Sequence, residues 1–499
     1  MNFSELLQGL GGLSGGNPKI SGIDYDSRRV RPGWLFVAMQ GEKTDGNRHI
    51  DAALKNGAVA VVTDSPTEHP RPGVAWAVVP HGRQALAHLS ANFYGRPAER
   101  LKLTGITGTN GKTTVAFLIE SILNFCGKRC ALIGTIEYRV AGKILPAPHT
   151  TPESLELNQI LSEALHAQAT DAVMEVSSHA LEQGRVYGIH YDVALFTNLT
   201  RDHLDYHQDM ESYFAAKRLL FEGQGVKPPR AAVINFDDQY GRRLMSKGSS
   251  EEIITYGLDG ADFRADNIDL QPLSTTFNLF GPAGNVAVHS SLVGRINVYN
   301  LLAASAAAWA RGCSLPQIAK AIGNFHQVPG RFERVDCGQP FTVVVDYSHT
   351  DDALRNLTSI ARDFAGRLGA HGRVITVFGC GGDRDKTKRP LMGEAAGQGS
   401  DFVVLTSDNP RSEDPLAIIQ DALPGLQKNG VRYSVEANRK KAIELALGEA
   451  KPGDIVLLAG KGHEKTQTTR EGVFPFDDVQ VARQTLKQMG YPNHTGGQE

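Results

Sequence analysis

A glycine-rich loop between an apolar strand and a helix constrains the fold of this chain more than any other feature. Residues 101–106 are short and β-prone, and residues 113–125 have the apolar periodicity of an amphipathic helix. Gly105, Gly108 and Gly111 allow a sharp turn that leaves the backbone N–H groups unobstructed. Because a helix N-terminus adds its positive dipole end, the segment predicts an α/β unit that binds an anion.

The end of this loop suits a nucleoside triphosphate. Lys112 can reach phosphate oxygens, and the hydroxyl of Thr113 can bind Mg²⁺. The general P-loop pattern is matched only at its GK[ST] end, because Ile106 stands where that pattern has glycine. The alternative is a glycine-rich turn with a solvated lysine. The joint presence of strand, glycines, lysine and helix favours phosphate binding.

Alternation of strands and helices divides the chain into three blocks. With 499 residues, about three domains are expected from length alone. Residues 1–97 mix short strands with helical pieces, residues 98–330 alternate strands and helices, and the alternation restarts over residues 331–499. We therefore predict an α/β protein with a smaller mixed N-terminal domain, a central P-loop ATPase domain with a parallel sheet, and a C-terminal Rossmann-like domain.

Charge and cysteine usage exclude several classes of protein. The formal net charge of −2 gives no basic field for nucleic acid or an anionic membrane. The five cysteines are scattered, without a disulfide framework or zinc spacing. The start, "MNFSELLQGLGGLSGG", lacks the pattern of a signal peptide, and no stretch reaches the length of a membrane span. A cytoplasmic location, without nucleic-acid or membrane partners, is expected.

Polar motifs follow the predicted strands in both α/β blocks. They are "TGTNGKTT", "EVSSH", "TNLTRDHLDYH", "DYSHT", "GCGGDRDKTKR", "TSDNPR" and "AGKGHE". Because open α/β sheets bind ligands at the carboxyl ends of their strands, two such rims predict one cleft. A nucleotide would lie on one side of it and a second reactant on the other.

Two of these motifs contain candidate metal ligands, and a third superficially resembles a dinucleotide-binding loop. Glu175 ends an apolar strand and can ligate Mg²⁺ beside the loop; the alternative is a buried, partnered carboxylate. His203 and His207 have the i, i+4 spacing of some zinc sites, but no HExxH motif or cysteine pair supports zinc. The segment "GCGGDRDKTKRP" has Arg384 where a dinucleotide loop has its third glycine, so an NAD site is rejected.

Several long motifs, in order and in all three blocks, resemble the Mur ligases of peptidoglycan precursor synthesis. These are "GTNGKTT", "EVSSH", "FTNLTRDHLDYH", "AAKRLLF", "VPGRFE", "DYSHT" and "GKGHE". The resemblance implies an ATP-dependent amide ligase that converts a carboxylate into an acyl phosphate, which an amine then attacks. It is greatest to members that add meso-2,6-diaminopimelate to the D-glutamate γ-carboxylate of UDP-N-acetylmuramoyl-L-alanyl-D-glutamate. A related ligase adding L-lysine is the alternative.

The resemblance also implies cofactors, domain roles and a set of ATP-binding residues. The N-terminal domain would bind the UDP-sugar, the central domain ATP, and the C-terminal domain the amino acid, in a monomer with Mg²⁺ as cofactor. Catalysis is assigned to Lys112, Lys217 and His203. Magnesium is assigned to Thr113, Glu175, His203 and Lys217, the last modified by CO₂ to a carbamate. Nucleotide contacts are assigned to Gly108, Thr109, Asn110, Gly111, Lys112, Thr113, Thr114, Asn300, Arg331, Asp346 and His349.

One of these motifs departs from the family pattern. The family's usual "DYAHTPDAL" reads "DYSHTDDAL" here, with Ser348 and Asp351 in place of alanine and proline. Asp346 and His349 are retained, so only the local turn geometry is in question.

The other two substrates are assigned in the same way. The UDP-sugar peptide is assigned to Tyr25, Ser27, Glu42, Lys43, Thr44, His149, Thr150, Thr151, Ser177, Gln183 and Arg185. Meso-diaminopimelate is assigned to Arg384, Asp408, Asn409, Pro410, Arg411, Gly460 and Glu464. Diaminopimelate differs from lysine by a distal carboxylate, for which the Arg411 fork is suited, while Glu464 and the Gly460 carbonyl can receive the distal ammonium. The alternative is an Asn-Pro turn with an exposed arginine.

Three rival functions remain. A ligase of the same superfamily would add lysine, D-Ala-D-Ala or glutamate to a folate, and "DNPR" argues against it. A P-loop NTPase working on motion or nucleic acid would turn over ATP without an amino acid or a UDP-sugar peptide. A non-catalytic nucleotide-binding protein would never turn ATP over.

Overall fold

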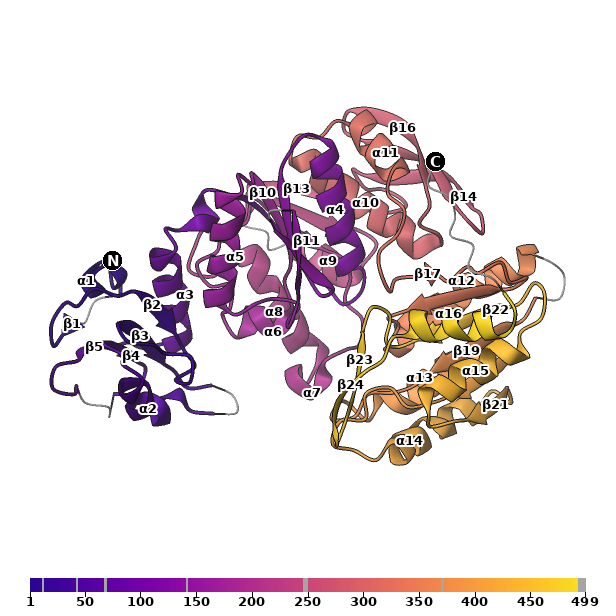
Figure 1. Cartoon of the computed structure of the whole chain (residues 1–499). Coiled ribbons are helices and arrows are strands. Elements are labelled where there is room, and N and C mark those ends of the chain that lie inside the picture. Colours follow the sequence, from indigo (N-terminus) through magenta and orange to yellow (C-terminus); the bar gives the residue numbers. More distant parts are fainter. Residues whose placement is uncertain are drawn as a thin grey trace.

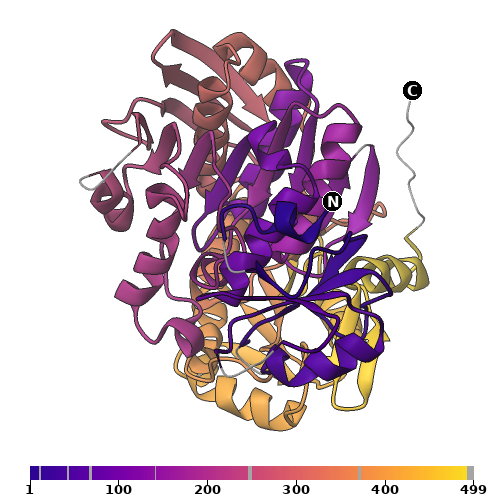
Figure 2. The ribbon, with the colours of Figure 1, turned by 90° about the vertical axis from the view of Figure 1, so that its left-hand side faces the viewer.

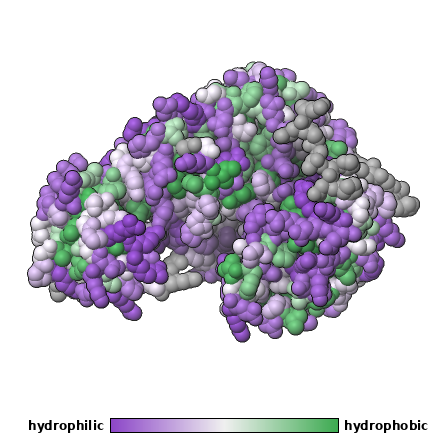
Figure 3. Space-filling model, in the orientation of Figure 1, coloured by the Kyte–Doolittle hydropathy of each residue, from purple (hydrophilic) through white to green (hydrophobic). Residues whose placement is uncertain are grey.

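Three α/β domains follow one another along the chain in the computed structural model (Figure 1). The structure describes residues 1–10, 13–41, 44–66, 70–140, 142–245, 250–368 and 372–491. Seen from the N-terminal side, the central domain lies above the C-terminal domain (Figure 2). The space-filling view shows a hollow below the central domain, between the N-terminal lobe and the C-terminal lobe (Figure 3). The expected α/β architecture is confirmed.

The N-terminal domain is a five-stranded sheet with helices on both faces. Its strands, in spatial order, are β1 (Leu13–Ser14), β5 (Ala75–Val78), β4 (Ala60–Thr63), β3 (Trp34–Ala38) and β2 (Gly22–Asp24). Its helices are α1 (Phe3–Leu6), η1 (Gly46–His49), α2 (Ile50–Lys55) and α3 (Gly82–Phe93), and η2 (Pro97–Glu99) follows them. Helices α1 and α3 pack on one face of the sheet and α2 on the other.

The central domain has an eight-stranded sheet with the glycine-rich loop at its middle strand. The strand order is β13 (Glu252–Tyr256), β12 (Ala231–Asn235), β11 (Val193–Phe196), β6 (Lys102–Thr107), β10 (Asp171–Glu175), β7 (Cys130–Ile133), β8 (Glu137–Val140) and β9 (Lys143–Pro146). The first six are parallel, as predicted, but β8 and β9 form an antiparallel hairpin at the edge that the sequence pattern did not reveal.

Helices bury both faces of the central sheet, which explains why its strands read as continuous apolar runs. One face is covered by α4 (Lys112–Phe125), α10 (Arg295–Ala310) and α11 (Leu315–Gly323). The other is covered by α5 (Ser154–His166), α6 (Ser178–Glu182), α8 (Met210–Glu222) and α9 (Gln239–Met245), with α7 (Leu204–His207) nearby. The strand-rich stretch after β13 is the small sheet β14 (Arg264–Leu270), β15 (Thr275–Gly281) and β16 (Gly284–Ser290).

The C-terminal domain is a second, separate α/β sheet. Its strand order is β17 (Glu333–Arg334), β18 (Thr342–Asp346), β22 (Ile455–Ala459), β19 (Val374–Phe378), β20 (Phe402–Leu405) and β21 (Arg432–Val435), parallel except for β17. Helices α12 (Asp351–Leu368), α13 (Lys388–Gly399) and α14 (Pro415–Gln427) cover one face, and α15 (Arg439–Glu449) and α16 (Asp478–Gln488) the other. A hairpin of β23 (Thr466–Thr469) and β24 (Gly472–Pro475) follows the "GKGHE" loop.

Candidate active site

Sheet register brings the glycine-rich loop and Glu175 to one edge of the central sheet. Strand β6 lies between β10 and β11, all three parallel, with Glu175 paired in register with Ile106. The loop after β6 and the turn after β10 therefore emerge side by side. This is the arrangement that the strand-end motifs predicted.

The loop is held in shape by the segment that directly follows strand β11. Gly108 has φ +144°, and a Cβ there would overlap the Thr197 hydroxyl, so only glycine fits. Asn198 accepts a hydrogen bond from the Asn110 backbone N–H at 3.0 Å and donates its side-chain amide to the Asn110 carbonyl at 3.1 Å. Asn198 thus clamps the loop, a role that no sequence pattern indicated because it acts across 88 positions.

A hydroxyl and a fully buried carboxylate meet at the start of helix α4. The Thr113 hydroxyl donates to Glu175 Oε2 at 3.0 Å, and Glu175 has no exposed surface. Thr135 holds the same carboxylate through its backbone N–H at 2.8 Å and its hydroxyl at 2.9 Å. Hard oxygen donors grouped at a phosphate loop suit Mg²⁺, so these side chains fit the ion that the sequence implied.

Two lysines converge on the same loop carbonyl. Lys112 Nζ donates to the Gly108 and Thr109 carbonyls at 3.0 and 2.9 Å, and Lys217 Nζ donates to the Gly108 carbonyl at 2.8 Å. Lys217 is 1% exposed and lies 4.4 Å from the Tyr213 ring centroid. Burial, reinforced by the charge of Lys112, lowers the pKa of Lys217 well below its ordinary value. A neutral amine beside the phosphate loop is the form that can react with CO₂.

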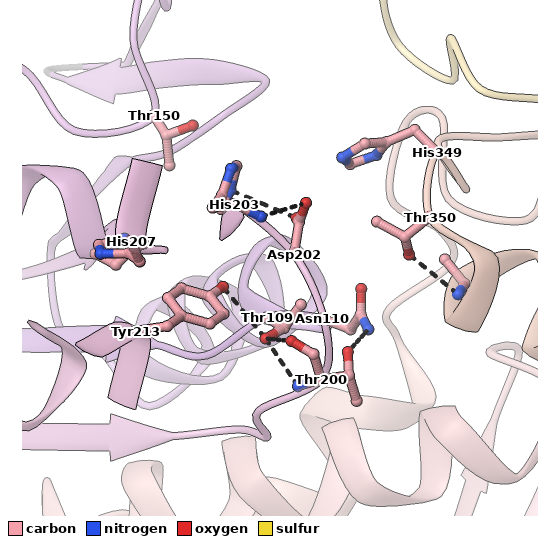
Figure 4. Close-up of polar contacts among 12 residues, drawn as sticks. Thr109, Asn110, Thr150, Thr200, Asp202, His203, His207, Tyr213, His349 and Thr350 are labelled. Carbon is pink, nitrogen blue, oxygen red and sulfur yellow. Dashed lines mark hydrogen bonds and ion pairs between the residues drawn. The ribbon is translucent and has the colours of Figure 1, made fainter. Parts of the chain in front are cut away.

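His203 and Asp202 face the C-terminal domain across the site (Figure 4). The His203 Nε2 to Asp202 Oδ2 distance is 3.4 Å, and the His203 side chain is 44% exposed. Partial desolvation lowers the pKa of His203, against the opposing effect of Asp202. The lowered pKa favours the neutral ring, which keeps a nitrogen lone pair for a cation.

His207 lies in a different environment. Its Nε2 is 2.8 Å from the Ser178 hydroxyl, its Nδ1 is 3.0 Å from Glu182, and its side chain is 1% exposed. These contacts are structural and hold α7 against α6.

One cavity of about 280 Å³ is lined by both the central and the C-terminal domains. Its central wall includes the whole loop from Thr109 to Thr114, together with Glu175, His203 and Asn300. Its C-terminal wall contains these residues of the hinge and the β18 loop: Arg331, Phe332, Asp346, Tyr347, Ser348 and His349. The predicted nucleotide residues thus line one cavity, apart from Gly108, whose carbonyl accepts from Lys112 and Lys217.

The hinge and the "DYSHT" loop hold each other. Asp346 accepts hydrogen bonds from the Phe332 N–H at 2.7 Å and the Ser348 N–H at 2.8 Å. Ser348, where the family has alanine, adds its hydroxyl to the same carboxylate, while Asp351 starts α12 and pairs with Arg355. Arg331 donates to the Thr113 hydroxyl at 3.2 Å and stacks 4.4 Å over the Tyr347 ring. The departures from the family pattern therefore leave the loop well supported.

A polar cluster forms where β20 and β22 end. Asn409 Nδ2 donates to Glu464 Oε2 at 2.8 Å, and the hairpin strand β23 binds Asn409 Oδ1 through the Thr468 N–H at 2.9 Å. Lys461, with no exposed surface, lies 3.0 Å from Glu464 Oε2, 3.2 Å from Asn409 Oδ1 and 3.5 Å from Asp408 Oδ1. Lys461 lies within the motif "AGKGHE", which indicated no role for it; in the structure it is the buried cation that joins the cluster.

Two guanidinium groups flank this cluster. Arg411 follows Pro410, has φ +54°, and donates to the Gly382 carbonyl at 2.6 Å. Burial, followed by the charge of Arg384, lowers the pKa of Arg411. A Cβ at Gly381 would lie 3.1 Å from Arg411 Nη1 and 3.8 Å from Arg384 Cγ, so both arginines border one glycine loop. Gly460 borders the polar cluster, because a Cβ added to it would lie 3.1 Å from Asp408 Oδ2.

Of the residues expected at the UDP-sugar, Tyr25 and Gln183 make contacts between the first two domains, while Thr150 and Ser177 line the cavity. The Tyr25 hydroxyl donates to Glu156 at 3.2 Å. Ser27, two residues further along the chain, is buried. Glu42 and Lys43 lie outside the described residues, and Thr44 and His149 are exposed. The remaining residues of the set are these central-domain side chains: Thr150, Thr151, Ser177, Gln183 and Arg185.

A phosphate loop faces a second α/β domain across one cavity. This arrangement is typical of a nucleotide-dependent enzyme that has a separate binding site for a second reactant. Three family models match the chain: "Mur ligase family, catalytic domain" over residues 19–94, "Mur ligase middle domain" over 106–308, and "Mur ligase, glutamate ligase domain" over 330–462. The chain belongs to the Mur ligase family. Members of this family form amide bonds in an ATP-dependent reaction, so the expected ATP-dependent amide ligase is confirmed.

Similar proteins share nearly the full length of the chain. The UDP-N-acetylmuramoyl-L-alanyl-D-glutamate--2,6-diaminopimelate ligase of Solibacter usitatus is 54% identical over 95% of this chain and 94% of its own. The ligase of the same name from Geobacillus thermodenitrificans is 46% identical over 98% and 100%. A solved structure of a ligase with that name is 36% identical, with a TM-score of 0.66, over 94% of this chain and 95% of its own.

Among the helices of the described segments, none combines the length and the apolar character required to cross a bilayer.

Proposed function

We propose that this chain joins meso-2,6-diaminopimelate to the D-glutamate γ-carboxylate of UDP-N-acetylmuramoyl-L-alanyl-D-glutamate. The γ-phosphoryl group of ATP passes to that carboxylate, leaving ADP and an acyl phosphate. An amine of diaminopimelate then attacks the acyl carbon, and phosphate and a proton leave. The observation that carries the proposal is the cavity that the phosphate loop shares with Tyr347 of the C-terminal domain, whose ring lies 5.0 Å from that of His463, the residue before Glu464 of the polar cluster. The names of the relatives support the choice of substrates.

The central domain supplies the phosphoryl-transfer machinery in this proposal. Lys112 leaves its loop carbonyls and reaches the transferring phosphate, where a fixed cation offsets developing charge. Asn300 and Arg331 border the adenine and phosphate positions, and His349 closes over them from the C-terminal domain. Thr113, Glu175 and His203 would hold Mg²⁺, which when bound neutralises phosphate charge.

Lys217 is proposed to act as a carbamate, which turns a buried cation into a carboxylate-like ligand beside Gly108. Lys217→Ala should lower kcat about a hundredfold or more, and added acetate or formate should restore part of it, because a small carboxylate can occupy the vacated space. Initial rates with and without each acid, and after removal of CO₂, measure this. Arg218→Lys, on the outer side of the same helix, should change nothing. An active enzyme that releases no CO₂ on acid treatment would refute the carbamate.

Within the C-terminal domain, opposite charges are separated so as to fit a zwitterion. The distal carboxylate of diaminopimelate is placed between Arg384 and Arg411, beside Gly381. Its distal ammonium is placed at Asp408 and Glu464, near the Gly460 carbonyl. Lys461 already neutralises part of that acidic pair and fixes the Asn409 amide, so it is a positioning residue.

Lys461→Met tests that positioning role. Loss of the ammonium frees Asn409 and Glu464 to rotate, so KM for diaminopimelate should rise at least about tenfold, while KM for ATP and for the UDP-sugar stays within about twofold. Lys461→Arg should recover part of the affinity. Equal increases in all three KM values would show that Lys461 only supports the fold.

The domain boundaries, the oligomeric state and the cellular location are proposed as well. Boundaries near residues 97 and 330 separate a UDP-sugar domain, an ATP domain and an amino-acid domain, matching the separate sheets. The cavity is complete within one chain, which favours a monomer, and five free cysteines favour the cytoplasm.

ADP release measured in the presence and absence of each acceptor separates the ligase from its rivals. The ligase releases ADP only when both the UDP-sugar dipeptide and the amino acid are present, beyond a slow background. Turnover that needs neither acceptor would favour an NTPase, and binding without turnover would favour a non-catalytic protein. Lysine in place of diaminopimelate should support only slow release.

A further inference from the structure

Helix α3 of the N-terminal domain carries an arginine into the junction with the central domain. Arg83, the second residue of α3, is 22% exposed, and its Nη1 lies 3.1 Å from Gln183 Oε1 and 3.6 Å from Glu153 Oε2. Figure 1 shows α3 facing α5, and Leu155 of α5 packs into the N-terminal core. Arg83 therefore reaches the central domain across 100 positions of sequence.

A second guanidinium meets Arg83 at the same oxygen atoms. Arg185 Nε donates to Gln183 Oε1 at 2.9 Å and lies 3.9 Å from Glu153 Oε2. Two cations thus share one amide oxygen and one carboxylate, which leaves one positive charge in excess. Like charges held this closely need a further anion for balance.

The arginine pair lies on a polar path between the cavity and the N-terminal domain. Ser177 lines the cavity, its hydroxyl is 3.4 Å from that of Thr151, and Arg185 donates to the Thr151 carbonyl at 3.3 Å. On the side of the N-terminal domain, Glu156 lies one turn of α5 after Glu153. It accepts a hydrogen bond from Tyr25, which is close to Ser27 in sequence. A substrate with its carboxylate in the cavity and its uridine at Ser27 must pass the arginine pair at its middle.

We propose that Arg83 binds the diphosphate of the nucleotide-sugar, as the second arm of a clamp whose first arm is Arg185. The inference rests on the proposed function and deepens it. A diphosphate placed there displaces Gln183 from the two guanidinium groups and supplies the missing negative charge. The N-terminal domain then recognises the diphosphate as well as the uridine, and a sugar dipeptide without its nucleotide is discriminated against.

Two acceptors that differ only in the nucleotide test this: UDP-N-acetylmuramoyl dipeptide and N-acetylmuramoyl dipeptide. Arg83→Ala should raise KM for the UDP-linked acceptor about tenfold to a hundredfold, with kcat within about twofold. For the acceptor without the diphosphate, the same substitution should leave kcat/KM unchanged. Arg71→Ala, which removes an N-terminal cation paired with Asp51, is the matched control and should behave like the unmodified enzyme.

A second variant guards against a folding defect. Arg83→Gln keeps a donor for Glu153 but loses the charge, and it should weaken binding of uridine diphosphate to the full chain while leaving binding of uridine unchanged. Equal losses for both acceptors, or for both uridine compounds, would mean that Arg83 only docks α3 on α5 and would overturn the proposal. If the unmodified chain ligates neither acceptor, the proposed function fails instead, while the uridine diphosphate comparison still decides the clamp.

Discussion

The unmodified enzyme should use meso-diaminopimelate with a kcat/KM about 10⁴-fold above that for lysine. Lysine lacks the distal carboxylate, so it would leave the Arg411 guanidinium, which lies beside Gly381 and feels the charge of Arg384, without an anion. A site built around a polar group rejects an analogue without it by roughly this factor, because its own buried groups stay unpaired. Burial, followed by the charge of Arg384, lowers the pKa of Arg411, and a bound carboxylate would act in the opposite direction.

Arg411→Ala should remove most of that preference. The kcat/KM for diaminopimelate should fall at least about a hundredfold, while that for lysine stays nearly constant. Because Arg411 has φ +54°, arginine and alanine carry similar backbone strain there, so the change reports on the side chain. Arg411→Lys keeps the charge without the paired donors and should fall between the two. Comparable efficiency for both amino acids in the unmodified enzyme would overturn the specificity claim and leave the ligase assignment standing.

Replacing Lys112 with alanine should lower kcat/KM about a thousandfold. The lysine is the cation nearest the expected γ-phosphate position, and removal of one preorganised charge from such a site typically costs this much. Its hydrogen-bond partners are the backbone carbonyls of Gly108 and Thr109, and Glu175, which faces its charge, keeps the hydrogen bonds from Thr113 and Thr135, so the fold should remain.

Steady-state kinetics and thermal unfolding of Lys112→Ala together check this expectation. The unfolding temperature should stay within a few degrees of the unmodified value, and ATP should still bind through the other loop groups. A well-folded variant with near-normal turnover would remove Lys112 from the phosphoryl-transfer step.

Regular patterning made most of the fold predictable. The parallel strands of the central sheet and the helix after Gly111 lie within a few residues of the predicted positions, because apolar runs and glycine punctuation are local signals. The hairpins β8–β9 and β23–β24 were missed. Their strands are four residues long and mostly not buried, so they lack a continuous apolar run.

The site was predictable only where its residues form motifs. Thr113 and Glu175 sit in recognisable segments and do meet, at 3.0 Å. The roles of Asn198 and Lys461 were not predicted although both lie within quoted motifs, and Arg83 was not identified, since the contacts that define these roles reach 52 to 100 positions along the chain. Such contacts depend on sheet register and domain packing, which a single sequence does not encode locally.

A competition experiment tests whether the chain adds meso-diaminopimelate, and not lysine, to the UDP-linked dipeptide. The chain is incubated with ATP, Mg²⁺, UDP-N-acetylmuramoyl-L-alanyl-D-glutamate and equal concentrations of meso-diaminopimelate and lysine, and the product is weighed by mass spectrometry. The proposed function predicts a single UDP-linked tripeptide that contains diaminopimelate, with one ADP formed per amide. A lysine-containing tripeptide as the main product, or ADP formed without any amide, would contradict it.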